Sequence, residues 1–248
     1  MEYTNIEWLG HEGVEFTLED YVCKLIKPKC KPNGKWVLKT HYFTAFPETE
    51  RLFLERGYHL AFQTNRTSFA TEDDIERKAR FVKFVSKEFG LAPTCSMVGM
   101  SCGGLYAVTL TAAHPELADV LYLDAPVMNL LSICDLGDAK SGLCETTLKW
   151  MEMSMSEMLA YRDHPIDKMH ILLGRDIPIV MVSGDADTVV PYHENGALLE
   201  DYYRRHGGRI RVWLKPGGDH HPHGLTDREA EVVDAIEAFS RENDAKRN

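Results

Sequence analysis

The sequence lacks the features that would place it in a membrane or on a nucleic acid. No stretch approaches the run of about 18 apolar residues that a transmembrane helix needs. Lys and Arg form neither a block nor a basic amphipathic helix, and 28 basic against 38 acidic side chains give a formal net charge of −10 at pH 7. Because an acidic surface repels phosphates, we expect no nucleic-acid partner and no membrane partner.

An export signal and a CxxC pair are also missing. The N-terminus has no basic start followed by an apolar run, which predicts a cytoplasmic protein. The six cysteines are therefore expected to be free thiols, and their spacing argues against a zinc site. We expect no cofactor and no metal. A single acidic domain of this kind is expected to be a monomer or a homodimer.

Apolar runs alternate with amphipathic patterns along the 248 residues. Strands are predicted at 21–26, 34–43, 58–64, 95–100, 119–126, 178–184 and 209–217. Helices are predicted at 47–57, 72–90, 103–114, 192–206 and 226–241. The alternation predicts an α/β fold, with a mostly parallel central sheet and helices on both faces, in a single domain over residues 1–248.

One long segment, residues 127–177, interrupts this alternation. It is rich in methionine, and one helical face would carry Leu148, Met151, Met155 and Leu159. The pattern predicts a helical insertion. Two compatible roles follow: an extra helix packed on the body, or a cap over a pocket that methionine lines with adaptable apolar surface.

A single serine stands in the motif G-x-S-x-G, formed by Gly99, Ser101 and Gly103, between a predicted strand and a predicted helix. The motif places a nucleophile on a sharp strand-to-helix turn, where side chains at 99 or 103 would collide with neighbouring chain. The following helix N-terminus favours negative charge, and the amide of Cys102 is placed to stabilise an oxyanion. Ser101 is the predicted nucleophile. The Cys102 thiol is the weaker alternative, because position 102 faces away from the turn.

A serine nucleophile needs a base and an orienting acid. Asp187 follows the strand 178–184 in "SGDADTVVP" and is the predicted acid. Two rivals remain open: Asp185, which would otherwise brace the same turn, and Asp124, which would otherwise hold the turn after an earlier strand.

The predicted base is His220, which follows a Gly-Gly-Asp turn in "KPGGDHHPHGL". The rival histidines, His221 and His223, are expected to shape the loop or to bind substrate. Three imidazoles with Asp219 would also suit zinc, but adjacent histidines rarely point at one ion and the serine needs a base. The order serine, acid, histidine therefore predicts a catalytic triad and no metal.

The loop after the strand 34–43 is expected to supply a second oxyanion donor. The backbone amide of Tyr42 or Phe43 is the predicted group. Aromatic and histidine side chains that could line the substrate pocket are Trp36, His41, Tyr42, Phe43, Phe46 and Trp150. Trp150 is predicted to bind substrate, and core packing is the alternative role for each of these six residues.

These motifs resemble those of the α/β-hydrolase superfamily. More closely, the chain is similar over residues 16–240 to single-domain serine esterases, or prolyl-oligopeptidase-like hydrolases, of polysaccharide-degrading bacteria. The similarity lies in "WVLKTHYFTAFPE", "GMSCGGLY", "DAPV", "GDADTVVP" and "KPGGDHHPHGL". Two positions depart from that group: Cys102 stands where an arginine is familiar, and Thr44 stands where a glycine is expected.

The resemblance implies the α/β-hydrolase fold and a serine esterase, since some of these relatives occur among enzymes that strip ester groups from plant glycans. The expected substrate is a small-molecule or glycan ester. A serine peptidase of prolyl-oligopeptidase type is the first alternative, disfavoured because the sequence shows no propeller domain. A ligand-binding protein on a hydrolase scaffold is the second, disfavoured because all three triad members are present.

Overall fold

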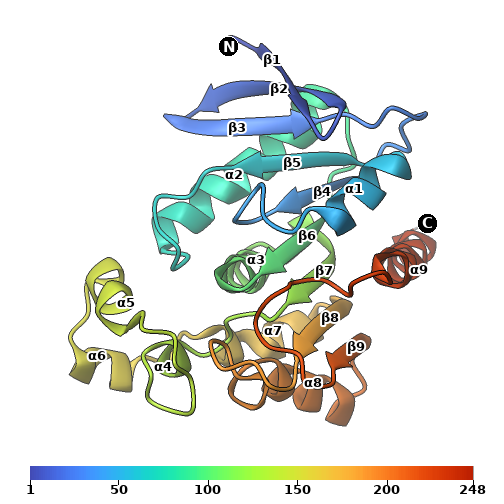
Figure 1. The fold of residues 1–248 in the computed structure, drawn as a ribbon. Helices are drawn as coiled ribbons and strands as arrows, with labels where there is room; N and C mark the ends of the chain where they lie inside the picture. The colour runs from blue at the N-terminus through green and yellow to red at the C-terminus, as the bar shows by residue number, and fades with distance from the viewer. Residues whose placement is uncertain (248) are drawn as a thin grey trace.

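The computed structural model describes residues 1–247, which form one nine-stranded sheet in the order β1-β2-β3-β5-β4-β6-β7-β8-β9 (Figure 1). Three antiparallel strands lie at one edge: β1 (Thr4–Trp8), β2 (His11–Leu18) and β3 (Tyr21–Ile26). Six mutually parallel strands follow: β5 (His59–Gln63), β4 (Trp36–Lys39), β6 (Cys95–Met100), β7 (Ala118–Asp124), β8 (Ile179–Gly184) and β9 (Ile210–Lys215). The predicted mostly parallel α/β sheet is confirmed.

Helices cover both faces of this sheet, as predicted. One face carries α1 (Glu48–Glu55) and α9 (Glu229–Arg247); the other carries α2 (Glu72–Phe89), α3 (Cys102–Ala113) and α8 (Gly196–Arg205). Successive side chains of β7 point to opposite faces of the sheet, so both faces offer apolar surface to helices. Val120 packs in the cluster with α9, and Leu121 packs in the cluster with α3. Among the described residues, no helix is long and apolar enough to cross a membrane.

The hairpin β1–β2 was not predicted from the sequence. Its turn is two residues long, and both Leu9 and Gly10 have positive φ, of 49° and 78°. Such turns match the twist of a hairpin, and a glycine between two alternating segments is their usual signal. The signal was weak here because residues 4–8 are mostly exposed at the sheet edge.

The predicted strand 34–43 is too long, since β4 ends at Lys39. The chain leaves the sheet at Thr40, whose hydroxyl lies 2.9 Å from the carbonyl oxygen of Val98 and 2.7 Å from that of Gly103. Those contacts direct residues 40–46 over the end of β6, where Ser101 follows.

The 3₁₀ turns are η1 (Pro115–Leu117), η2 (Pro165–Lys168) and η3 (Tyr192–Glu194).

Residues 127–177 contain four short helices, of which α5 and α6 project from the body in Figure 1. They are α4 (Leu130–Ile133), α5 (Cys144–Met151), α6 (Met155–Ala160) and α7 (Met169–Gly174). The expected continuous face from Leu148 to Leu159 is wrong. Glu152 ends α5 in a left-handed conformation, and Ser154 starts α6 with a capping box to Glu157.

Candidate active site

Ser101 lies on a turn too tight for side chains at two neighbouring glycines. Its φ of 52° and ψ of −120° are strained for a residue with a Cβ. A Cβ at Gly99 would lie 2.7 Å from the carbonyl oxygen of Gly103, and a Cβ at Gly104 would lie 2.4 Å from the Cβ of Pro126. The sequence motif singled out 99 and 103, but position 104 is more crowded than 103, where the nearest atom would lie at 3.1 Å.

The three predicted triad residues meet at the carboxyl ends of the parallel strands. The Oγ of Ser101, after β6, lies 3.1 Å from the Nε2 of His220, in the loop after β9. The Nδ1 of His220 lies 2.7 Å from Asp187, which follows β8. The other carboxylate oxygen of Asp187 accepts hydrogen bonds from the amides of Val189 and Val190, which fix the carboxylate toward the imidazole.

The rival acids have other partners. Asp185 accepts a 2.6 Å hydrogen bond from the amide of Gly217, so it braces the turn after β9. Asp124, at the end of β7, lies 3.0 Å from the Nδ1 of His223 and accepts the amide of Gly224 at 2.5 Å. Among the acidic side chains of residues 1–247, only Asp187 bonds the ring of His220. Asp124 and His223 therefore form a second aspartate–histidine pair, which the sequence did not indicate.

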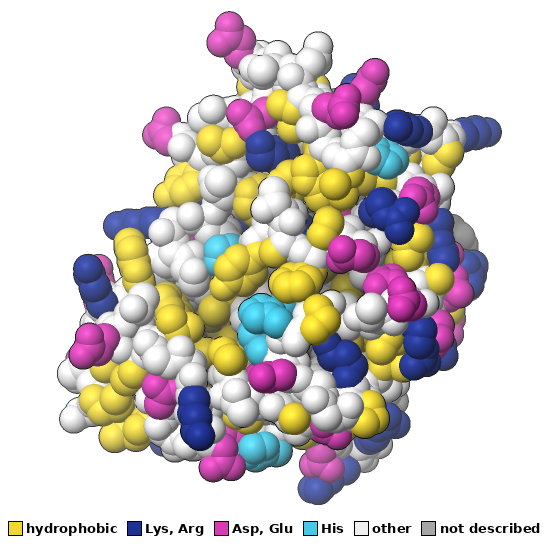
Figure 2. Space-filling model, in the orientation of Figure 1, with side chains coloured by type: hydrophobic (Ala, Val, Ile, Leu, Met, Phe, Trp, Pro, Cys, Tyr) yellow, Lys and Arg dark blue, Asp and Glu magenta, His cyan; other side chains and the backbone are white. Residues whose placement is uncertain are grey.

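All three histidines of the loop converge. The ring centroids of His220, His221 and His223 lie 4.8 to 5.0 Å apart, contrary to the expectation that neighbouring histidines diverge. His220 and His223 are buried, whereas His221 is exposed and stacks on Phe46 at 5.4 Å. Partial burial and the charges of the other two imidazoles lower the pKa of His221. Figure 2 shows histidine side chains near the middle of this face, with hydrophobic side chains around them.

The predicted oxyanion donors lie in two segments, the start of α3 and the loop after β4. Cys102 is the first residue of α3, so its amide has no acceptor inside the helix. Partial burial and the neighbouring Cys102 thiol raise the pKa of Tyr42, which keeps its hydroxyl a donor. The ring of Phe43 turns away into the core, between Trp8 and Phe62.

The Cys102 thiol is poorly suited to be the nucleophile. The residue is 3% exposed, and burial raises the pKa of its thiol above the usual value. The thiolate is the reactive form of cysteine, so a raised pKa disfavours attack by this group.

A buried ion pair holds the loop over the turn. The Nζ of Lys39 lies 2.7 Å from Glu50 and 2.6 Å from the carbonyl oxygen of Ala45, with both charged side chains almost fully buried. The left-handed positions of this loop are Tyr42 and Phe46, not Thr44, which explains why a glycine at 44 is dispensable. No sequence pattern indicates this pair, because lysine and glutamate are ordinarily exposed.

The remaining predicted pocket residues have mixed positions. Trp36 is 1% exposed and donates to the carbonyl of Ala92, so it belongs to the core. Trp150 is 41% exposed on α5. A cavity of about 700 Å³ lies between α2, α3 and the insertion, where Met151 and Met153 line it but Trp150 does not. Methionine from the insertion therefore does line a hollow, which runs along α3 from Leu105, four residues after Ser101, to Ala113.

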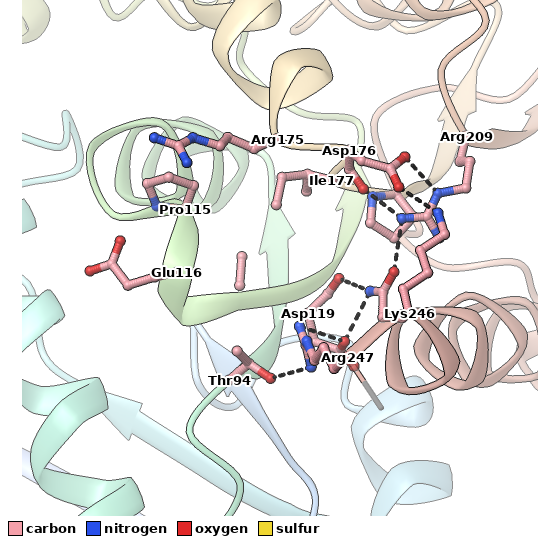
Figure 3. A pocket seen from close by; sticks show the side chains of 13 residues that line it. Thr94, Pro115, Glu116, Asp119, Arg175, Asp176, Ile177, Arg209, Lys246 and Arg247 are labelled. Atoms are coloured by element: carbon pink, nitrogen blue, oxygen red, sulfur yellow. Dashed lines mark hydrogen bonds and ion pairs between the residues drawn. The ribbon is translucent and has the colours of Figure 1, made fainter.

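A second cavity lies at the amino ends of the parallel strands, opposite the end that carries Ser101 (Figure 3). It measures about 260 Å³ and is lined by residues at the amino ends of strands, such as Ala118, Pro178 and Arg209. Its charged groups largely pair with one another; Arg209, for instance, bonds Asp176 at 2.9 Å. Ligands of open α/β sheets bind at the carboxyl ends, where Ser101 lies, so this cavity is not the candidate site.

Comparison with known proteins identifies the same architecture. The profile of the prolyl oligopeptidase family matches residues 71–244, which include Ser101, Asp187 and His220. A solved puromycin hydrolase is 18% identical, with a TM-score of 0.66 over 91% of this chain and 37% of that one. An acylaminoacyl peptidase from Pyrococcus horikoshii is 12% identical, with a TM-score of 0.62 over 89% and 37%. No curated protein matches by sequence.

The chain thus spans little more than a third of these solved proteins. At such low identity, the likeness to these structures shows the fold alone; together with the family match it confirms the α/β-hydrolase resemblance. The family description supports the peptidase alternative better than the expected ester hydrolase.

Proposed function

The chain belongs to the prolyl oligopeptidase family, and on this premise we propose that it is a serine hydrolase working through a covalent acyl-enzyme. The observation that carries the proposal is the continuous chain of contacts from Ser101 through His220 to Asp187, at 3.1 and 2.7 Å. A serine hydroxyl becomes a useful nucleophile only when a base accepts its proton, and this geometry supplies the base.

The reaction follows from the position of each group. His220 accepts the proton of Ser101 as its oxygen attacks the substrate carbonyl, and Asp187 orients and stabilises the resulting imidazolium. The amide of Cys102 and the N-terminus of α3 stabilise the oxyanion. His220 then protonates the leaving group, and a water molecule repeats the sequence on the acyl-enzyme.

Tyr42 is the second oxyanion donor in this proposal, through its hydroxyl, whose pKa the neighbouring Cys102 thiol helps to raise. Tyr42→Phe removes the hydroxyl and keeps the backbone amide. We expect kcat to fall by about 10²–10³-fold, the usual loss for one such donor. Steady-state kinetics measure it; a kcat within threefold of the parent would assign the donor to an amide of the loop, as the sequence analysis expected.

A peptide amide is the first substrate class to test. The family description supports it, as do the names of the similar solved proteins, a puromycin hydrolase and an acylaminoacyl peptidase. The cavity of about 700 Å³ lined by Leu105, Met151 and Met153 would take an apolar acyl or side-chain group, with residues 127–177 acting as its cap.

A carboxylic ester is the second class. It is favoured by the motifs "DAPV" and "KPGGDHHPHGL", through which the chain resembles esterases of polysaccharide-degrading bacteria. The stacked rings of His221 and Phe46 near Ser101 offer a flat surface on which a sugar ring could pack.

Two experiments test these proposals. A fluorophosphonate probe with mass spectrometry should modify Ser101 and leave the Ser101→Ala variant unlabelled; labelling elsewhere in active protein would refute the mechanism. Values of kcat/KM on aminoacyl nitroanilides, on short acyl nitrophenyl esters and on acetyl, methyl and feruloyl sugar esters then separate the classes. Turnover of amides supports the peptidase, and turnover of esters alone supports the esterase. Tight saturable binding without turnover of either would favour the ligand-binding alternative.

A further inference from the structure

Three imidazoles converge at the mouth of the candidate site. One ring nitrogen from each of His220, His221 and His223 lies within 4.8 Å of the others. Zinc–nitrogen bonds of about 2.0–2.1 Å hold tetrahedral ligand atoms ~3.4 Å apart. The nitrogens therefore need to approach one another by at most about 1.4 Å to hold an ion, and the exposed ring of His221 has room to move.

The two buried members are already oriented as metal ligands usually are. His220 and His223 each have Nδ1 on a buried carboxylate, Asp187 at 2.7 Å and Asp124 at 3.0 Å. Each carboxylate accepts a hydrogen bond from Nδ1–H, which keeps the proton on Nδ1 and leaves the Nε2 lone pair free for a metal. This carboxylate–histidine arrangement is the usual support of histidine ligands, because it fixes the tautomer and raises ligand basicity.

From this geometry we propose that His220, His221 and His223 bind a divalent transition-metal ion, with Zn²⁺ as the probe, and that the ion reversibly blocks the site. The inhibition rests on the proposed hydrolase function, whereas the binding does not. The ion takes the Nε2 lone pair of His220, so the imidazole cannot accept the proton of Ser101. A fourth position stays open to water or to the Ser101 oxygen. Imidazole ligands favour Zn²⁺, Cu²⁺ and Ni²⁺ over Mg²⁺ and Ca²⁺.

A second group of possible ligands provides the matched control. Asp138, His193 and Glu194 also come within reach of one another, but only one of them is an imidazole. Asp138 and His193 are exposed, and Glu194 is engaged by the hydroxyl of Ser132 at 2.5 Å. This group lacks the buried histidine–carboxylate pairs of the loop, so it should not retain zinc.

Calorimetric titration of the chelator-treated chain with Zn²⁺ tests the binding. We expect one ion per chain and a loss of affinity of at least about tenfold in His221→Ala and in His223→Ala. His193→Ala and Cys30→Ser, which remove the control ligand and the exposed thiol, should bind as the parent does. Undetectable binding, unchanged affinity in His221→Ala, or loss in either control would overturn the proposal. Circular dichroism checks that each variant is folded.

The inhibition is tested by comparing each variant with its own metal-free rate. Zn²⁺ should abolish turnover by the parent, a chelator should restore it, and Mg²⁺ at the same concentration should have no effect. In His221→Ala the inhibitory concentration should rise about tenfold or more, in step with its loss of affinity. Binding at the cluster with full turnover would overturn the regulatory part. Failure of the probe to label Ser101 would instead refute the hydrolase and leave the calorimetric result standing.

Discussion

Two aspartate–histidine pairs lie side by side at the carboxyl end of the sheet, and only one reaches a nucleophile. Asp124 ends β7 and Asp187 follows β8, while their histidines are three residues apart in one loop. The Nδ1–carboxylate distances are similar, 2.7 Å for His220 and 3.0 Å for His223. His220 continues to Ser101 at 3.1 Å, whereas the ring of His223 packs edge-on against Phe46.

The difference separates orientation from catalysis. A buried carboxylate fixes the tautomer and direction of an imidazole in both pairs, and that alone creates no active site. What distinguishes the pair of the proposed triad is the strained turn that brings the hydroxyl of Ser101 to the remaining nitrogen of His220. The other pair holds the loop, since Asp124 also accepts the amide of Gly224.

Removing the imidazole of the proposed base should have the largest effect. His220→Gln leaves Ser101 without a proton acceptor, and we expect kcat to fall by about 10⁴–10⁶-fold. Steady-state and single-turnover kinetics on the substrate found in the panel measure the loss. If His220→Gln stays within tenfold of the parent while His223→Gln loses activity, the two pairs exchange roles.

The acid of the proposed triad should come next. Asp187→Asn keeps the shape but presents the wrong tautomer of His220, and we expect a fall of about 10⁴ in kcat. The thermal midpoint should barely change, because the amide oxygen still accepts from Val189 and Val190. A variant that loses stability and keeps activity would contradict the assignment.

The matching change in the other pair should act on stability. In Asp124→Asn a single side-chain oxygen has to accept the hydrogen bonds of both His223 and the amide of Gly224. The new side-chain NH₂ group, itself a donor, then faces another donor. We expect a loss of about 1–3 kcal/mol in the free energy of unfolding and less than a tenfold change in kcat. Urea unfolding gives the first value and kinetics the second; a kcat loss as large as that of Asp187→Asn would show that Asp124 is catalytic.

His41, an imidazole beside the site with no carboxylate bonded to it, extends the comparison of the two pairs, and its expected effect is the smallest. Burial, with the nearby charge of Lys78, lowers the pKa of His41 to about 4. An unfolded histidine takes up its proton near pH 6.5. The unfolded chain therefore binds more protons between these values, so stability is lost as the pH falls from about 6.5 toward 4.

His41→Gln should flatten that part of the profile. Urea unfolding of parent and variant at pH 4.5, 5.5 and 7 measures the difference between them, which removes the contribution of the carboxyl groups. A constant difference across this range would show that His41 does not titrate as its burial requires.

Local sequence was sufficient to predict most of the fold and to single out the three residues that the structure brings together as the proposed triad. The strand, helix and glycine patterns around Ser101, Asp187 and His220 each extend over fewer than about ten residues, and short apolar runs bounded by turns are what such patterns report. The hairpin β1–β2 was not predicted because β1 lies at the exposed edge of the sheet and shows little apolar alternation.

Contacts between distant segments could not be predicted. Asp124 and His223 are 99 residues apart, and nothing in either neighbourhood marks the other. The same holds for the buried pair Lys39–Glu50 and for Gly104 against Pro126. The break in the insertion after Met151 depended on one left-handed residue, Glu152, which is not a residue type that favours that conformation.

A loop fastened at residue 220 by Asp187 and at residue 223 by Asp124 has one consequence for how such a protein changes over generations. The stretch between the anchors is only two residues long, and the side chain at its start, His221, is exposed. Replacements at 221 can be tried there without shifting the imidazole next door, so selectivity and sensitivity to ions can drift while the reactive machinery stays intact.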